Sequence, residues 1–305
     1  MRTWDQWLSD HLVFVLLVIF GAAVALIVSA FAFYAAYFPG PIAADHGRWG
    51  EFGDFLGGAL NPILGFLSLL ALLMTLAIQN RELSISSREL ANSARALAEQ
   101  SKALKLQNFE RTFFELVRLH HSIVSGIDLR NNQAQVTAQG RDCFRIFFDT
   151  RLKRWHNDMV GQLAAQPPLK IAQEAYWGFY GDNQHEIGHY FRNLYRVFKF
   201  IDESTVFQED TEGLFGGNFF GESAGAKKKQ YASIMRAQLS SFELALLFYN
   251  ALHPVGEKFK PLIEAYALFE NMRLEQLFNA REHVPLYAET AYGDQDLSRF
   301  RKVEL

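Results

Sequence analysis

The chain has 305 residues, a formal net charge of −3 and a single cysteine, Cys143. The near-neutral charge gives no reason to expect nucleic-acid binding, and one cysteine excludes an intrachain disulfide framework or a cysteine-rich zinc site. Half of the residues are apolar, and 28 of them are Phe. Few prolines and long runs of Leu, Ala, Glu and Gln predict a mostly α-helical fold, while no long alternating stretch predicts a sheet.

The first long apolar stretch is residues 12–38, which contain no charged side chain. About 20 apolar residues cross a bilayer as a helix, so this stretch is long enough to span it with some tilt. It is too long for the apolar core of a signal peptide. Aromatic side chains suited to the membrane interface flank it, with Trp4 and Trp7 before it and Tyr34 and Tyr37 near its end. We predict a transmembrane helix.

A second, less uniform span is predicted at residues 52–78. Gly57, Asn61 and Gly65 recur at intervals of four residues and form a stripe that allows close helix contact. Polar groups inside a membrane usually face a bundle interior or water. Asn61 and Asp54 are therefore expected to line a polar path. The alternative places Asp54 among the lipid headgroups and lets Asn61 hold the helical hairpin together.

Basic residues near the spans predict the orientation of the chain. Arg48 is the only Lys or Arg in the segment that connects the two spans, whereas Arg81, Arg88 and Arg95 closely follow the second span. Because short cytoplasmic segments carry the excess of Lys and Arg, both termini are expected on the cytoplasmic side. The chain is thus predicted to be a multi-pass membrane protein with a transmembrane hairpin at residues 1–78.

A seven-residue repeat begins inside the second span and continues beyond it. Its leucines are Leu69, Leu76, Leu83, Leu90, Leu97 and Leu104. Seven residues make nearly two helical turns, so these leucines form one slowly winding stripe, as in a coiled coil. Small and polar neighbours favour a loosely packed bundle over a tight two-stranded zipper. We predict a stalk helix at residues 79–125 that assembles copies of the chain, or alternatively lies on its own domain.

Residues 126–305 are predicted to form an all-helical cytosolic domain. The polar segment 126–140 is expected to be a loop, and the glycine-rich segment 205–229 lacks the spacing of a phosphate-binding loop. His120 and His121 diverge on a helix, so one is expected in the core and the other in solvent. Apolar periodicity predicts helices at residues 141–165, 171–179, 184–203, 230–252 and 260–280.

His185-Glu186-Ile187-Gly188-His189 fits the His-Glu-x-x-His pattern of zinc hydrolases. On a helix the two histidines share a face and could bind zinc, with Glu186 as the general base. A working site also needs a third ligand, which no downstream pattern supplies, and Gly188 weakens a helix that has to hold ligands rigidly. We expect no cofactor and no catalysis, and a zinc hydrolase that uses His185, Glu186 and His189 is the alternative.

A polar cluster lies on the fourth of these predicted helices, which is otherwise apolar. Arg236, Ser240 and Glu243 recur at positions i, i+4 and i+7, which places them on one face of an unbroken helix. Gln238 and Asn250 lie on the same helix. Such a cluster either joins neighbouring helices by buried hydrogen bonds or binds a ligand.

Three blocks of sequence, Gly53–Pro62, His189–Ile201 and Tyr231–Asn250, resemble the AbiC-like phage abortive infection membrane proteins of bacteria. The three blocks occur in order, so the resemblance extends over nearly the whole chain. It implies a two-span, mostly helical membrane protein of anti-phage defence, sometimes encoded beside other defence components. It supplies no catalytic residue.

We therefore expect an effector of abortive infection in the bacterial cytoplasmic (inner) membrane. The helical domain would sense infection through a core that consists of the polar cluster, His189 and Arg192. The trigger would come from the phage or from a neighbouring defence component. The spans would then assemble or open and disrupt the membrane. The expected partners are the lipid bilayer and further copies of the chain, and the alternative is a non-enzymatic scaffold that holds a defence partner at the membrane.

Overall fold

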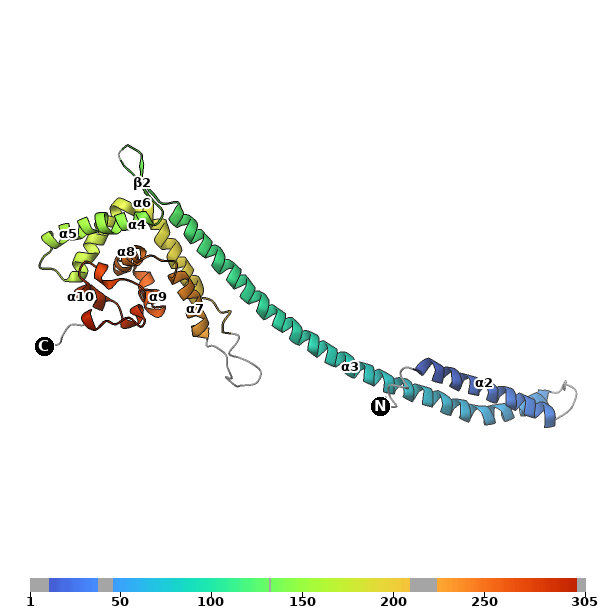
Figure 1. Cartoon of the computed structure of the whole chain (residues 1–305). Helices are drawn as coiled ribbons and strands as arrows, with labels where there is room; N and C mark the ends of the chain where they lie inside the picture. Colours follow the sequence, from blue (N-terminus) through green and yellow to red (C-terminus); the bar gives the residue numbers. More distant parts are fainter. Residues whose placement is uncertain (1–10, 38–45, 132, 209–223, 301–305) are drawn as a thin grey trace. The chain divides into compact units, whose positions relative to one another are not determined.

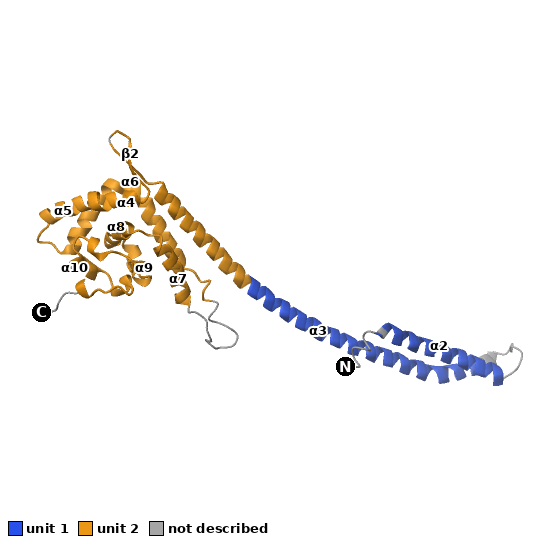
Figure 2. Ribbon diagram, in the orientation of Figure 1, with its two compact units in different colours: residues 1–100 blue, residues 101–305 orange. Residues whose placement is uncertain are grey.

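The computed structural model describes residues 11–37, 46–131, 133–208 and 224–300, which are mostly α-helical, as predicted (Figure 1). The aromatic residues Trp4 and Trp7 and the last residue of the first predicted span, Phe38, lie outside the described residues. The chain divides into two compact units, residues 1–100 and 101–305 (Figure 2).

The first unit contains α2 (Leu12–Tyr37) and the N-terminal part of α3 (His46–Ser125). Both helices are long and apolar enough to cross a membrane by length and composition. Aromatic rings connect them, since the ring of Phe52 lies 5.5 Å from that of Phe31 and 4.3 Å from that of Tyr34, centroid to centroid. These contacts pack the last turns of α2 against the first turns of α3.

Helix α3 continues for 80 residues, although Pro62 lies inside it. Proline removes one backbone hydrogen bond, and helices of membrane-spanning type tolerate this loss. The second predicted span and the predicted stalk are thus parts of one helix. That helix begins at His46, earlier than the predicted start at residue 52.

Residues 126–140, expected as a loop, contain a short β-hairpin. Strands β1 (Asp128–Arg130) and β2 (Val136–Gln139) pair antiparallel, with Leu129 opposite Ala138. An isolated two-stranded hairpin is only marginally stable, and here the buried side chain of Leu129 anchors it to the core. The prediction of an all-helical domain was wrong in this detail.

Three helical segments follow in close succession where one helix was predicted. They are α4 (Asp142–Arg145), a π-helical stretch (Ile146–Leu152) and α5 (Lys153–Gln162). The π-helical stretch buries Phe147, Phe148 and Leu152 in the core of the second unit. One wide turn thus redirects apolar side chains without ending the helical run.

Helix α6 (Pro168–Asp202) spans 35 residues without the break that was predicted near Gly181. A glycine inside a helix costs about 1 kcal/mol relative to alanine. The buried face on both sides of Gly181, which includes Phe179 and Ile187, outweighs this cost because each large apolar side chain contributes about 1.5–3 kcal/mol when buried.

The predicted helix 230–252 is in fact two helices, α7 (Ala224–Arg236) and α8 (Ser241–Leu252). Ser240 has extended backbone angles and caps α8, since its hydroxyl accepts a hydrogen bond from the amide of Glu243. The Glu243 carboxylate in turn accepts one from the amide of Ser240 at 2.7 Å. This reciprocal capping box starts a new helix and ends the predicted i, i+4, i+7 face.

The predicted helix 260–280 ends early, as α9 (Lys260–Ala265). Ala267 follows it with a φ of 50°, a left-handed conformation that a right-handed helix does not contain. The remaining described chain is built from α10 (Ala280–His283) and short 3-10 turns at Glu257–Phe259, Leu274–Gln276, Val284–Leu286, Glu289–Tyr292 and Ser298–Phe300.

The C-terminal turns of α3 belong to the core of the second unit. Phe109, Phe113, Val117, His120 and Val124 are all buried, and their spacing of three or four residues places them on one face of the helix. His121 is exposed, which confirms the prediction that one of the two adjacent histidines is buried and the other solvated.

Candidate functional site

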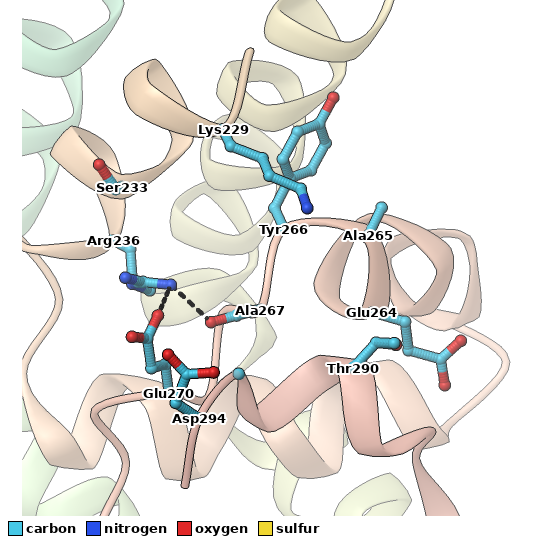
Figure 3. A pocket seen from close by; sticks show the side chains of 11 residues that line it. Lys229, Ser233, Arg236, Glu264, Ala265, Tyr266, Ala267, Glu270, Thr290 and Asp294 are labelled. Atoms are coloured by element: carbon cyan, nitrogen blue, oxygen red, sulfur yellow. Dashed lines mark hydrogen bonds and ion pairs between the residues drawn. The ribbon is translucent and has the colours of Figure 1, made fainter. Parts of the chain in front are cut away.

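A cavity of about 660 Å³ opens beside α7 in the second unit. Its walls come from α7, from the end of α9 with the chain that follows it, and from the 3-10 turn Glu289–Tyr292 with the segment after it (Figure 3). Arg236, Glu270 and Asp294 lie together at one end of the view, and Glu264 and Thr290 lie at the other. The cavity therefore brings together side chains that are far apart in the sequence.

Arg236 is the most constrained cation of this cavity, with 14% of its side chain exposed. One of its terminal nitrogens donates to the carbonyl oxygen of Ala267 at 2.9 Å and forms an ion pair with Glu270. Its Nε is buried and has no hydrogen-bond partner among the described residues. The acceptor carbonyl belongs to the left-handed residue Ala267, so a strained backbone position holds the guanidinium.

A glycine in the lining of the cavity permits this arrangement. Gly293 has a φ of 58°, and a Cβ atom there would approach Cγ of Glu270 to 2.9 Å. Any larger residue would both strain the backbone and displace Glu270 from Arg236.

The charges of the cavity are mixed and slightly acidic in sum. Two cations, Lys229 and Arg236, face three carboxylates, Glu264, Glu270 and Asp294. Such a lining suits a polar ligand with a basic group better than a multiply charged anion, because the carboxylates outnumber the cations.

Glu243 is fully buried and forms a separate polar centre between helices. Besides the capping amide of Ser240, its carboxylate accepts a hydrogen bond from the hydroxyl of Tyr190 at 3.3 Å. Nε of Arg141 lies 3.8 Å from the same carboxylate. A buried polar group needs such partners, and this centre supplies them from α6, from the residue that caps α8 and from the segment before α4.

His120 of α3 completes this polar centre. Its Nε2 lies 4.0 Å from Oε1 of Glu243, and neither ring nitrogen has a hydrogen-bond partner within the described parts of the chain. Burial is the main cause that lowers the pKa of His120 to about 4, and the nearby side chains of His121 and Arg141 contribute to this shift. The imidazole is therefore neutral at pH 7, and it packs against the ring of Tyr190 at 5.2 Å.

The His-Glu-x-x-His residues lie in the middle of α6. The side chain of His185 is 76% exposed, and the carboxylate of Glu186 is bonded to Arg151 at 2.8 Å. Burial lowers the pKa of His189, and the neighbouring cation Arg192 lowers it further. Among the described residues there is no group of three or more His, Cys, Asp or Glu side chains that could hold a metal ion.

The structure does not bring the predicted sensing residues together in one cluster. Arg236 lines the first cavity, and Ser240 and Glu243 form the buried centre. Gln238 contributes only its backbone carbonyl, which accepts from Arg141 at 2.6 Å. Asn250 is buried and donates to the hydroxyl of Tyr176 at 2.7 Å.

The remaining two predicted residues, His189 and Arg192, are exposed on α6. Sequence reasoning missed Tyr190 and Glu270, which bond to Glu243 and Arg236. Tyr190 stands next to His189 in a block that the resemblance had singled out, and this position was its only signal.

In the second span, Asp54, Asn61 and Gly65 are exposed and Gly57 is half-buried. A Cβ atom at Gly65 would meet nothing within 4 Å, and one at Gly57 would meet only Nδ2 of Asn61, at 3.6 Å. Among the described residues, α2 therefore does not cover the stripe of small residues.

Residues 182–277 match the family model described as putative phage abortive infection protein. Comparisons with curated proteins and with solved structures gave no match. The match contains two of the three sequence blocks, His189–Ile201 and Tyr231–Asn250, and excludes the block in the second span. It also contains α7, α8 and most of α6. The predicted resemblance is thus confirmed over this segment, since residues 182–277 are similar to the family described as putative phage abortive infection protein.

Proposed function

We propose that the chain is a membrane-anchored effector of phage abortive infection. The helical domain responds to infection, α3 passes the change to the spans, and the spans assemble or open and break the permeability barrier. The family match over residues 182–277 supports the role in abortive infection. The two long apolar helices support the membrane anchor. The excess of basic residues after the second span supports cytoplasmic termini.

The observation that carries the assembly step is an uncovered face of α3. Leu83, Leu90 and Leu97 are 67%, 69% and 64% exposed. They follow the apolar span, in a part of the helix that is rich in Arg, Glu and Ser and suited to water. Three leucines in one stripe on such a helix indicate a partner, because burying each contributes about 1.5–3 kcal/mol.

The leucine stripe continues the small-residue stripe of the span. Gly65 and Leu83 lie 18 residues apart, which is about five turns of an α-helix, and Asn61 and Leu97 lie 36 residues apart, about ten turns. The two residues of each pair therefore point in nearly the same direction from the axis of α3. A single helix face runs from the predicted membrane interior into water, first with small residues and then with leucines.

A second copy of the chain is the partner that fits this face. Copies inserted in one bilayer in the same orientation are parallel, and their α3 helices start at the same depth. Leucines then meet leucines at the same level. The small and polar residues beside them, such as Ser87 and Ala94, allow close approach and oppose other registers.

The same helix also reaches the buried centre of the sensing domain. His120 of α3 faces Glu243 of α8, and both lie in the second unit. A movement of α8, which lies within residues 182–277, would therefore act on α3 directly. We propose this contact as the step that links sensing to the spans.

The test replaces Asn61 by leucine on the proposed contact face. Ala59→Leu is the matched control, because Ala59 is also exposed and lies on the other side of the helix. We expect Asn61→Leu to abolish infection-triggered depolarisation, measured with a potential-sensitive dye, and Ala59→Leu to leave it unchanged. Full depolarisation in the Asn61→Leu variant would contradict an opening of the spans. Full protection by a chain that lacks residues 1–78 would instead support a scaffold.

A further inference from the structure

A second hollow, of about 200 Å³, lies between α6 and the segment that follows α8. Its walls include the buried side chains of Tyr180, Phe191, Asn250 and Phe259. It belongs to the second unit and shares no lining residue with the cavity beside Arg236. All of its lining residues except Tyr180 lie in the segment that matches the family.

The charge of this hollow is entirely positive. Arg192 and Lys258 line it, and none of its lining residues is an Asp or Glu. Neither cation forms an ion pair with a carboxylate among the described residues, whereas Arg236 in the other cavity is paired with Glu270. Two uncompensated cations beside an aromatic wall favour an anion.

Glycines keep this hollow open. A Cβ atom at Gly188 would lie 3.1 Å from the hydroxyl of Tyr180 and 3.3 Å from a terminal nitrogen of Arg192. A Cβ atom at Gly256 would collide with the side chain and the carbonyl oxygen of Asn250. A side chain at either position would therefore press against polar groups of the lining, and glycine leaves this space free.

An aromatic surface adjoins the hollow, because Val255 lines both. There the rings of Trp177 and His253 stack with centroids 5.2 Å apart and an interplanar angle of 11°. Trp177 nevertheless remains 54% exposed. An exposed indole of this kind offers a stacking surface for a planar ring.

We propose that the hollow binds a phosphate-class anion and that the Trp177 surface stacks the planar ring of the same ligand. These are the two parts of a nucleotide. Arg192 and Lys258 pair with the phosphate, and the hydroxyl of Tyr180 donates to it. This site does not rest on the proposed assembly through α3, since all its residues lie in the second unit.

The experiment measures binding to the purified full chain in detergent by isothermal titration calorimetry. The probes are the four ribonucleoside monophosphates, inorganic phosphate and adenosine. We expect at least one monophosphate to bind more tightly than phosphate or adenosine. Arg192→Gln and Lys258→Gln should each weaken it about 10- to 100-fold, the effect of losing one charge-assisted hydrogen bond.

Arg196→Gln is the matched control, because Arg196 is exposed one turn further along α6 and does not line the hollow. Trp177→Ala should reduce binding of the monophosphate to that of inorganic phosphate. The proposal is overturned if no monophosphate binds, if adenosine binds as tightly, or if Arg192→Gln behaves like Arg196→Gln. Equal affinities for inorganic phosphate and the monophosphate would contradict the proposed stacking of the planar ring on Trp177. Since no outcome involves depolarisation, failure here is distinct from failure of the proposed effector function.

Discussion

Large apolar side chains are mostly buried in the second unit and mostly exposed in the first. In residues 101–305, rings such as Phe113, Phe144 and Phe147 are fully buried, whereas Phe14 and Phe20 of α2 are more than half exposed. The second unit can therefore gain its stability from its own core, but the first unit depends on material outside the single chain. In the proposed membrane protein, lipid would cover the apolar side chains within the bilayer but would not reach the leucines that follow the span. The difference between the units thus separates the folding core from the surface that we propose for assembly.

The largest expected effect comes from removing that surface. The triple variant Leu83→Ser, Leu90→Ser, Leu97→Ser should convert the detergent-purified protein from a discrete oligomer into a monomer. Three leucines together account for about 5–9 kcal/mol of burial per copy, more than most assemblies can lose. Light scattering measures the mass, and circular dichroism should show an unchanged helical domain.

The control for this variant changes the opposite face of the same helical turns. It replaces the residues two positions after each leucine, which are Ile85, Asn92 and Glu99, by serine. We expect the oligomer to persist in this variant. A monomeric wild-type protein, or an oligomer that survives the loss of all three leucines, would contradict assembly through α3.

The next largest effect is expected from a substitution in the core of the second unit. Phe113→Ala should destabilise the second unit by about 3–5 kcal/mol, because it leaves a cavity beside the ring of Tyr231. Leu119→Ala on the same helix is the control, since Leu119 is half exposed and its loss should change stability by about 0.5 kcal/mol or less. Urea unfolding of the full chain, followed by tyrosine and tryptophan fluorescence, measures both. Equal effects of the two variants would refute the burial of this helix face.

A smaller effect appears on acidification, through the buried His120. Its pKa is about 4 in the folded chain and near 6.5 when unfolded, so the unfolded state takes up the proton first. The contribution of the neutral His120 to the free energy of unfolding is fully present above pH 6.5. It falls by about 3 kcal/mol as the pH decreases towards 4.

Burial also lowers the pKa of His283 to about 4, so it contributes a similar slope. His120→Phe should therefore reduce the loss of unfolding free energy between pH 6.5 and 4 by about 3 kcal/mol, whatever its effect at pH 7. An unchanged slope in this variant would show that His120 is hydrated in solution.

Periodicity predicted the helical class and the course of α3, because an apolar span and a heptad repeat are both local patterns. The sensing cluster could not be predicted in this way. The prediction of this cluster assumed one helix through residues 230–252. In the structure the capping box at Ser240 starts a separate helix, so Glu243 does not lie on the helix face that contains Arg236. The sequence does contain the pattern of a capping box, which is a serine followed three residues later by a glutamate before an apolar run. The bond between Tyr190 and Glu243 spans 53 residues, and no local pattern predicts such a contact.

The smallest expected effect tests this capping box. Ser240→Ala removes the side chain that accepts from the amide of Glu243 and should lower the unfolding free energy by about 1 kcal/mol. Ser241→Ala, one residue later and inside α8, should change it by less than about 0.5 kcal/mol. Neither variant should change the mass of the assembly, because the cap lies wholly within the second unit. A change of mass in Ser240→Ala alone would contradict this expectation and would mean that the start of α8 acts on α3 even without infection.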